Sequence, residues 1–202
     1  MLRSGSSDLA KGKKFLNQLL YVQHVDKGKD TVSEIPELFF YEYLLTDREI
    51  FSSFNFTTYL SNPKANLEIL KSSLKDDITK VIVYSNPLPI PIKSDVTVHA
   101  FVVFETENEA NSKVTWWSLE KNGHYIVLQQ SPNKDDVTQK IYNAEKKETK
   151  RLEPVREREN AVGNYRPLEG LLRALWETSQ LSNPYHLLIS NCQNFASFVF
   201  EK

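Results

Sequence analysis

The single cysteine of the chain, Cys192, lies in a sequence context that predicts a reactive thiol. A short apolar run leads to Asn191, and apolar residues follow the cysteine at Phe195 and Val199. This pattern predicts a helix capped by Asn191, with Cys192 in its first turn. The free N–H groups and the positive dipole end of a helix N-terminus favour a thiolate over a thiol. The sequence therefore places the thiol where its pKa would be lowered.

A histidine in a strand-like segment is the natural partner for this thiol. His99 lies within the run 96–104, where apolar residues fall on both faces of a predicted strand. An imidazole close to Cys192 could take its proton and make it a nucleophile. Residue types alone also allow a structural interpretation, because lone cysteines and lone strand histidines are most often buried core residues. The position of the cysteine directly after an N-cap favours catalysis.

A third group that orients the imidazole is expected on the strand after His99. Residues 114–120 form the next strand-like run, and alternation places Ser118 and Glu120 on one face of it. A carboxylate or hydroxyl there would hold the imidazole tautomer. We rank Glu120 first, Ser118 second and His124, which lies in or beside a turn, third. Each of the three fits an ordinary polar surface residue equally well.

The other two histidines, His24 and His186, have no motif around them, and His186 is expected to be structural. The sequence contains no paired cysteines and no histidine pair with metal-ligand spacing. We therefore expect no metal site and no cofactor.

The composition is that of an ordinary globular protein. Its 202 residues are 40% hydrophobic and 25% charged, which suits one domain of good size or one domain with an appendage. A net charge of −1 and a pI of about 6.4 give no basic surface for nucleic acid. No stretch approaches the roughly 18 to 20 apolar residues of a membrane span, and one cysteine cannot form an internal disulfide. These features predict a cytoplasmic protein without an integral membrane segment.

The elements that must position the candidate residues fall into two unequal parts. Residues 1–80 are expected to form a helical N-terminal extension, with helix-type spacing around 15–20, 36–45 and 66–74. An aromatic cluster lies between the second and third of these predicted helices and is interpreted as core or as a groove for a partner. It consists of Phe51, Phe54, Phe56 and Tyr59.

Residues 81–202 are expected to form the second part, a domain built on a sheet. Apolar residues at every second position predict strands over 80–84, 96–104, 114–120 and 125–129. The last three of these strands are expected to form an antiparallel meander. A polar loop is predicted over 105–113, and a helix that begins with proline over 167–176. The charged run 145–159 is expected to be a solvated loop or helix face.

The order of these features resembles that of a known family. The chain resembles the circularly permuted NlpC-type papain-like fold in three features. These are a histidine within a strand, His99, a following strand that carries polar residues, and the pair Asn191-Cys192 at the start of a late helix. Within this fold, the likeness is to lecithin:retinol acyltransferase-like proteins and to picornaviral proteins with an H-box and an NC-box. The resemblance covers roughly residues 81–202. It implies an α+β fold with an antiparallel papain-like sheet packed on the cysteine helix, with Cys192 as nucleophile and His99 as general base.

These residues and the resemblance predict a cysteine-dependent hydrolase or acyltransferase that works through a thioester on Cys192. Peptide, isopeptide, amide and acyl-ester substrates all remain open, so the expected partner is a protein or an acyl or lipid substrate. Acyltransferase relatives commonly carry a membrane-anchoring helix after the cysteine helix, whereas this sequence stops at Lys202, which weakens the case for lipid chemistry. The alternative is a non-catalytic module that binds a protein partner. A close approach of Cys192 and His99 favours the enzyme.

Overall fold

The computed structural model describes most of the chain beyond residue 62. The described residues are 18–25, 30–35, 40, 63–88, 98–143, 145–162, 166–186 and 190–202. The aromatic cluster expected between 51 and 59 lies outside them, as does the helix expected over 36–45 apart from Phe40.

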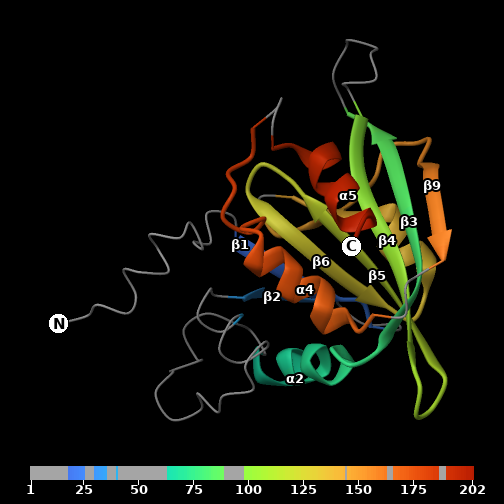
Figure 1. Cartoon of the computed structure of the whole chain (residues 1–202). Helices are drawn as coiled ribbons and strands as arrows, with labels where there is room; N and C mark the ends of the chain where they lie inside the picture. Colours follow the sequence, from blue (N-terminus) through green and yellow to red (C-terminus); the bar gives the residue numbers. More distant parts are fainter. Residues whose placement is uncertain are drawn as a thin grey trace.

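A seven-stranded mixed sheet organises the described chain, with the order β2-β1-β6-β5-β4-β3-β9 (Figure 1). Neighbouring strands run antiparallel, except that β1 and β6 are parallel. The strands are β1 (Gln18–Gln23), β2 (Thr31–Ile35), β3 (Asp77–Pro87), β4 (Val98–Asn108), β5 (Lys113–Lys121), β6 (Tyr125–Ser131) and β9 (Arg156–Val162). A separate pair consists of β7 (Lys140–Tyr142) and β8 (Glu148–Lys150).

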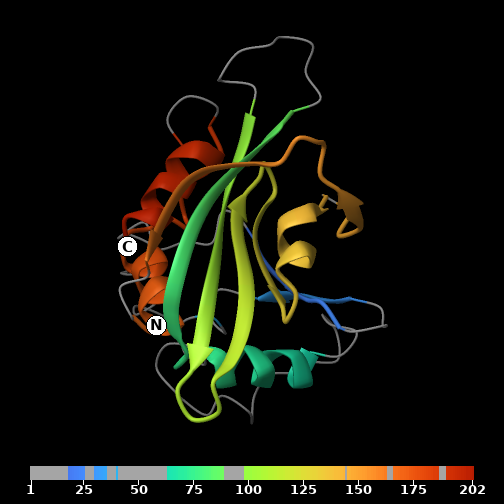
Figure 2. The same cartoon turned by 90° about the vertical axis from the view of Figure 1, so that its right-hand side faces the viewer.

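Helices lie on both faces of the sheet (Figure 2). One face is covered by α4 (Leu168–Glu177) and α5 (Cys192–Phe200), and the other by α3 (Lys134–Gln139) with the β7–β8 pair. A further helix, α2 (Pro63–Ser73), lies across one end of the sheet. Alternation along β4 supplies both cores, because Ala100 and Val102 pack in the cluster containing α5, whereas Phe101 and Val103 pack with α3. No helix in the described part of the chain is long and apolar enough to cross a membrane.

The structure corrects the expected architecture at its N-terminal end. The predicted helix around 15–20 is wrong at residues 18–20, which begin β1. The predicted antiparallel sheet is also wrong, because β1 runs parallel to β6 and the sheet is mixed. The cause is burial on both faces: Leu19 packs in one apolar cluster and Leu20 in another. A strand buried on both faces reads as a continuous apolar run, which periodicity cannot separate from a buried helix.

The other predicted elements are largely confirmed. The meander of β4, β5 and β6 is present, and α2 and α4 lie where helical spacing predicts them, with Pro167 as the N-cap residue of α4. The polar loop over 105–113 is shorter than expected, because β4 continues to Asn108. The boundary between 1–80 and 81–202 stays a prediction. In the described residues, β1, β2 and α2 share the sheet or its core with the later elements.

The N-terminus of α5 is fixed by the predicted cap. The Asn191 side-chain oxygen accepts hydrogen bonds from the N–H groups of Gln193 at 2.9 Å and Asn194 at 3.0 Å. The Asn194 side chain in turn accepts from the Asn191 N–H at 3.4 Å, which completes a capping box. The start of the helix is therefore defined at the residue before Cys192.

Replacing this cap should weaken the fold measurably. We expect Asn191→Ala to lower the free energy of unfolding by about 1 kcal/mol, because two helix N–H groups lose their acceptor. Asn191→Ser retains an acceptor oxygen and should recover most of the loss in the same urea titration. Equal losses in the two variants would contradict a capping role.

Candidate active site

The candidate site lies where β4 and β5 stop pairing. Their paired residues run up to Val102 opposite Leu119, and beyond this point β4 continues along β3 to Val98. The first turn of α5 meets this part of β4. The Gln193 side chain donates to the Val98 carbonyl oxygen at 3.4 Å, and the Cys192 Sγ lies 4.0 Å from the same oxygen. The end of the β4–β5 ladder therefore places the thiol beside the backbone of the strand that carries the histidine.

Cys192 and His99 interact inside the protein. Their exposed fractions are 3% and 6%. Burial alone would lower the pKa of His99, but its hydrogen bonds with Cys192 and Glu120 and their charges outweigh burial and raise the pKa to about 9. Burial alone would raise the pKa of Cys192, yet the hydrogen bond and charge of His99 and a backbone hydrogen bond from Ala100 lower it. Both shifts favour a thiolate paired with an imidazolium.

Glu120 occupies the position predicted for the orienting group. Val103 of β4 lies opposite Ser118 of β5, so alternation places Ser118 and Glu120 on the face that carries His99. The Glu120 Oε2 lies 2.7 Å from the His99 Nε2. The same imidazole also hydrogen-bonds the Cys192 side chain. The three side chains therefore form a connected Cys192–His99–Glu120 cluster.

Arg151 completes the surroundings of Glu120. Its guanidinium donates two hydrogen bonds to the carboxylate, from Nη1 to Oε2 at 3.0 Å and from Nη2 to Oε1 at 2.8 Å. The guanidinium carbon also lies 3.7 Å from the centre of the Phe101 ring, which provides a cation–π contact. Arg151 is 3% exposed, although it belongs to the charged run expected to be solvated. That expectation is wrong for this residue, because the fully buried carboxylate requires a positive charge beside it.

The Glu120–Arg151 pair keeps the carboxylate ionised. Burial alone would raise the pKa of Glu120, but the Arg151 charge and the hydrogen bond and charge of His99 lower it to about 2. A fixed negative charge at this position holds the imidazole orientation and stabilises its protonated form.

Hydrogen bonds continue from Glu120 to the N-terminal strands. The Gln129 Nε2 lies 3.5 Å from the Glu120 Oε1, and the Gln129 Oε1 lies 2.9 Å from the His24 Nε2. The other His24 nitrogen is 3.0 Å from the Asp30 Oδ2. His24 and Gln129 are both buried. Sequence motifs gave no signal for His24, because its partners lie on β6 and in the segment before β2.

The remaining predicted candidates lie apart from these contacts. Ser118 is fully buried and its Oγ has no hydrogen-bond partner in the structure as described, so it does not orient His99. His124 is exposed in the turn before β6. His186 pairs through its backbone with Ser190. The described residues contain no group of three or more histidine, cysteine, aspartate or glutamate side chains placed to hold a metal ion.

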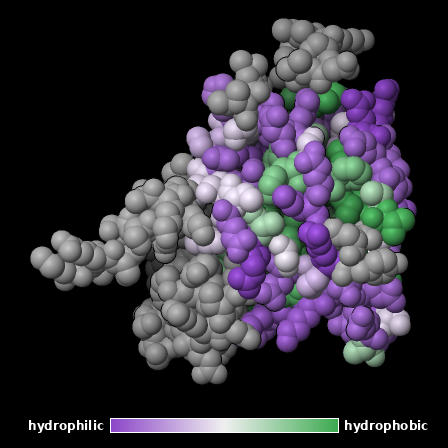
Figure 3. Space-filling view, in the orientation of Figure 1, coloured by the Kyte–Doolittle hydropathy of each residue, from purple (hydrophilic) through white to green (hydrophobic). Residues whose placement is uncertain are grey.

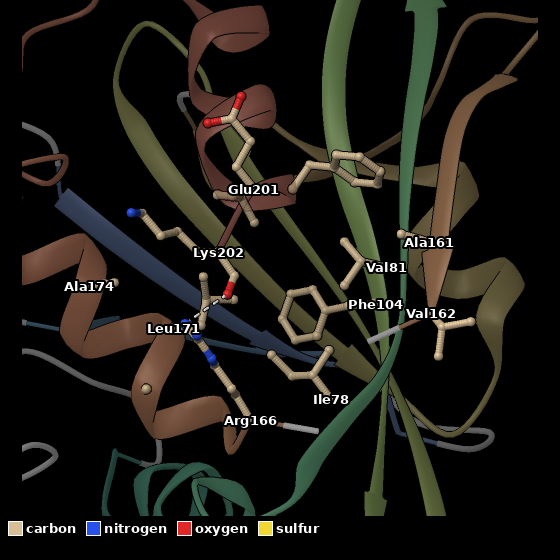
Figure 4. A pocket seen from close by; sticks show the side chains of 13 residues that line it. Ile78, Val81, Phe104, Ala161, Val162, Arg166, Leu171, Ala174, Glu201 and Lys202 are labelled. Carbon is tan, nitrogen blue, oxygen red and sulfur yellow. Dashed lines mark hydrogen bonds between the residues drawn. The ribbon is translucent and has the colours of Figure 1, made fainter. Parts of the chain in front are cut away.

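A surface pocket of about 140 Å³ lies at the opposite end of α5 from Cys192 (Figure 4). Its floor is apolar and includes Ile78, Val81 and Phe104, and the Arg166 guanidinium donates to the Lys202 carbonyl oxygen at 3.3 Å at its rim. The surface on this side shows apolar patches separated by polar residues (Figure 3). The cluster around Cys192 does not line this pocket.

The fold and the site together define an α+β protein whose mixed sheet carries a buried cysteine–histidine–glutamate cluster at the start of a C-terminal helix. No family model matches the sequence, and neither a curated protein nor a solved structure matches it.

The buried Glu120 carboxylate should make the free energy of unfolding depend on pH in the acid range. The pKa of Glu120 is about 2 when folded against an ordinary value of 4.5, so its contribution is present above pH 4.5 and lost as the pH falls toward 2. We expect the wild type to lose more unfolding free energy across this window than the double variant Glu120→Gln, Arg151→Met. Urea titrations at several pH values measure the difference. Parallel pH dependence in the two proteins would contradict an ionised buried Glu120.

Proposed function

We propose that this protein is a cysteine-dependent hydrolase or acyltransferase that forms a thioester on Cys192. The observation that carries the proposal is the connected cluster, in which Glu120 holds the His99 Nε2 at 2.7 Å and His99 also hydrogen-bonds the thiol. A nucleophile, a base and a group that orients the base are the parts that acyl transfer through a thiol requires.

The proposed reaction uses each residue in turn. The Cys192 thiolate attacks the substrate carbonyl carbon, forming the C–S bond while the carbonyl electrons move to oxygen. As the intermediate collapses, His99 gives a proton to the leaving group and a thioester remains. Water or an acceptor nucleophile then gives its proton to the neutral imidazole, attacks the thioester and releases the Cys192 thiolate. Glu120 stays ionised throughout and keeps Nε2 protonated.

The first turn of α5 supplies a donor for the negative oxygen of the intermediate. The N–H groups of Gln193 and Asn194 bond to the Asn191 side chain, and the Phe195 N–H bonds to the Asn191 carbonyl at 3.1 Å. The Cys192 N–H lies in the same turn, directly beside the nucleophile, so we assign it to the oxyanion.

The resemblance to permuted papain-like proteins supports this reaction class and leaves peptide, isopeptide, amide and acyl-ester substrates as the proposed range. A protein or an acyl or lipid molecule is the corresponding partner. Fold resemblance does not choose among these substrates, because one fold hosts many activities.

A non-catalytic module that binds a protein is the second candidate. The 3% exposure of Cys192 favours it, since a substrate must reach the sulfur. The buried charges around the thiol favour catalysis, because perturbed pKa values concentrate at functional sites.

Alkylation tests whether the thiol is activated. Iodoacetamide should modify the native protein at pH 7 faster than it modifies a free thiol, because the pKa of Cys192 is lowered from 9.0. His99→Ala should slow this reaction by about tenfold or more, while His124→Ala, in the exposed turn, should not. A thiol that reacts only after denaturation would identify Cys192 as a structural core residue.

Acylation separates chemistry from folding. With p-nitrophenyl acetate as probe, the wild type should release a burst of p-nitrophenol and carry an acetyl group on Cys192, as located by peptide mass spectrometry. Cys192→Ala should abolish both while changing the free energy of unfolding by about 1 kcal/mol or less. A loss of several kcal/mol, or acetylation at another residue, would contradict the proposed role.

A further inference from the structure

Tyr185 approaches the thiol from the segment between α4 and α5. Its hydroxyl lies 4.0 Å from the Cys192 Sγ, and its side chain is partly buried. No sequence motif marks this tyrosine, which lies seven positions before Cys192. The hydroxyl is an additional hydrogen-bond donor beside the reacting sulfur.

The segment that carries Tyr185 is held on both sides. The Lys121 Nζ donates to the Asn183 carbonyl oxygen at 2.6 Å and to the Ser190 Oγ at 2.9 Å. Immediately after Tyr185, His186 and Ser190 exchange two backbone hydrogen bonds of 3.0 Å. Lys121 is 1% exposed, whereas its partner Asn183 is exposed and Ser190 is half-buried.

The end of β5 therefore positions the site from two sides. Glu120 contacts His99, and the next residue, Lys121, holds the segment that leads to Cys192. Successive side chains of a strand point to opposite faces, which allows one strand end to make both contacts. These contacts anchor the chain at Asn183 and at His186, on either side of Tyr185.

Attack by a thiolate creates a negative oxygen bonded to the carbon that the sulfur has joined. Donors stabilise this oxygen when they lie about 2.7 to 3.1 Å from it and are held in place beforehand. A hydroxyl 4.0 Å from the Sγ is close enough to reach an oxygen one carbon atom beyond the sulfur. The Cys192 N–H, assigned above, is one such donor, and the Tyr185 hydroxyl lies near enough to be another.

We propose that Tyr185 is a further catalytic residue, whose hydroxyl donates a hydrogen bond to the oxyanion formed when Cys192 attacks a carbonyl. This inference rests on the proposed function. Burial, together with the charge and hydrogen bond of Cys192, raises the pKa of Tyr185 to about 12. The hydroxyl consequently keeps its proton at neutral pH and acts as a donor.

Two reactions of the same thiolate test this assignment. Acylation by p-nitrophenyl acetate passes through an oxyanion, whereas alkylation by iodoacetamide displaces iodide from a saturated carbon and forms none. Tyr185→Phe should therefore slow acylation by about 10² to 10³-fold and leave alkylation within about threefold of wild type. The ratio of the two rates is the measurement, and it is insensitive to changes in thiolate content.

Tyr84→Phe is the matched control, because it removes the same hydroxyl oxygen from a different tyrosine. The Tyr84 hydroxyl lies 3.4 Å from Glu157. This substitution should leave both rates unchanged. If Tyr185→Phe slows both reactions equally, the hydroxyl acts on the thiolate alone and the proposal is wrong. Unchanged rates in Tyr185→Phe would also overturn it. A wild-type protein that is alkylated but never acylated at Cys192 would remove the proposed function, and the assignment of Tyr185 with it.

Discussion

A carboxylate removed from water stays ionised only where positive charge and hydrogen-bond donors replace its hydration, and Glu120 imposes this requirement on the whole site. Arg151 meets it with two hydrogen bonds, and His99 adds a third contact. The same carboxylate holds the imidazole that hydrogen-bonds Cys192. The state of the thiol therefore depends on an interaction on the far side of the histidine.

Elements distant in sequence converge on this carboxylate. Arg151 follows β8, Gln129 lies on β6, and His24 follows β1, which joins the sheet as the parallel neighbour of β6. Pairing of β4 and β5 stops near the site, which brings the start of α5 to the backbone of β4. The N-terminal strands thus contribute to the polar surroundings of the site as well as to the sheet.

Local signals explain what could be predicted from the sequence. The cap at Asn191 and the alternation along β4 and β5 depend on neighbouring residues, so the helix start, the histidine strand and the face of Glu120 followed from spacing. Arg151 could not be found in this way, because a buried arginine in a charged run differs from its solvated neighbours only by its tertiary partner. The helix predicted at Leu19 and Leu20 is wrong for a related reason, because a strand buried on both faces shows no alternation of apolar and polar residues.

The central claim is that Cys192 and His99 form an ion pair inside the protein at neutral pH. The ultraviolet absorbance of the thiolate, titrated in the wild type and corrected with Cys192→Ser, measures this directly. The account predicts that thiolate absorbance appears at lower pH in the wild type than in a free thiol and is present at about pH 7, because the hydrogen bond and charge of His99 lower the pKa of Cys192 and hold the thiolate as an ion pair. It also predicts that His99→Ala loses this absorbance at the same pH. Absorbance that rises only above pH 9 in both proteins would contradict the account.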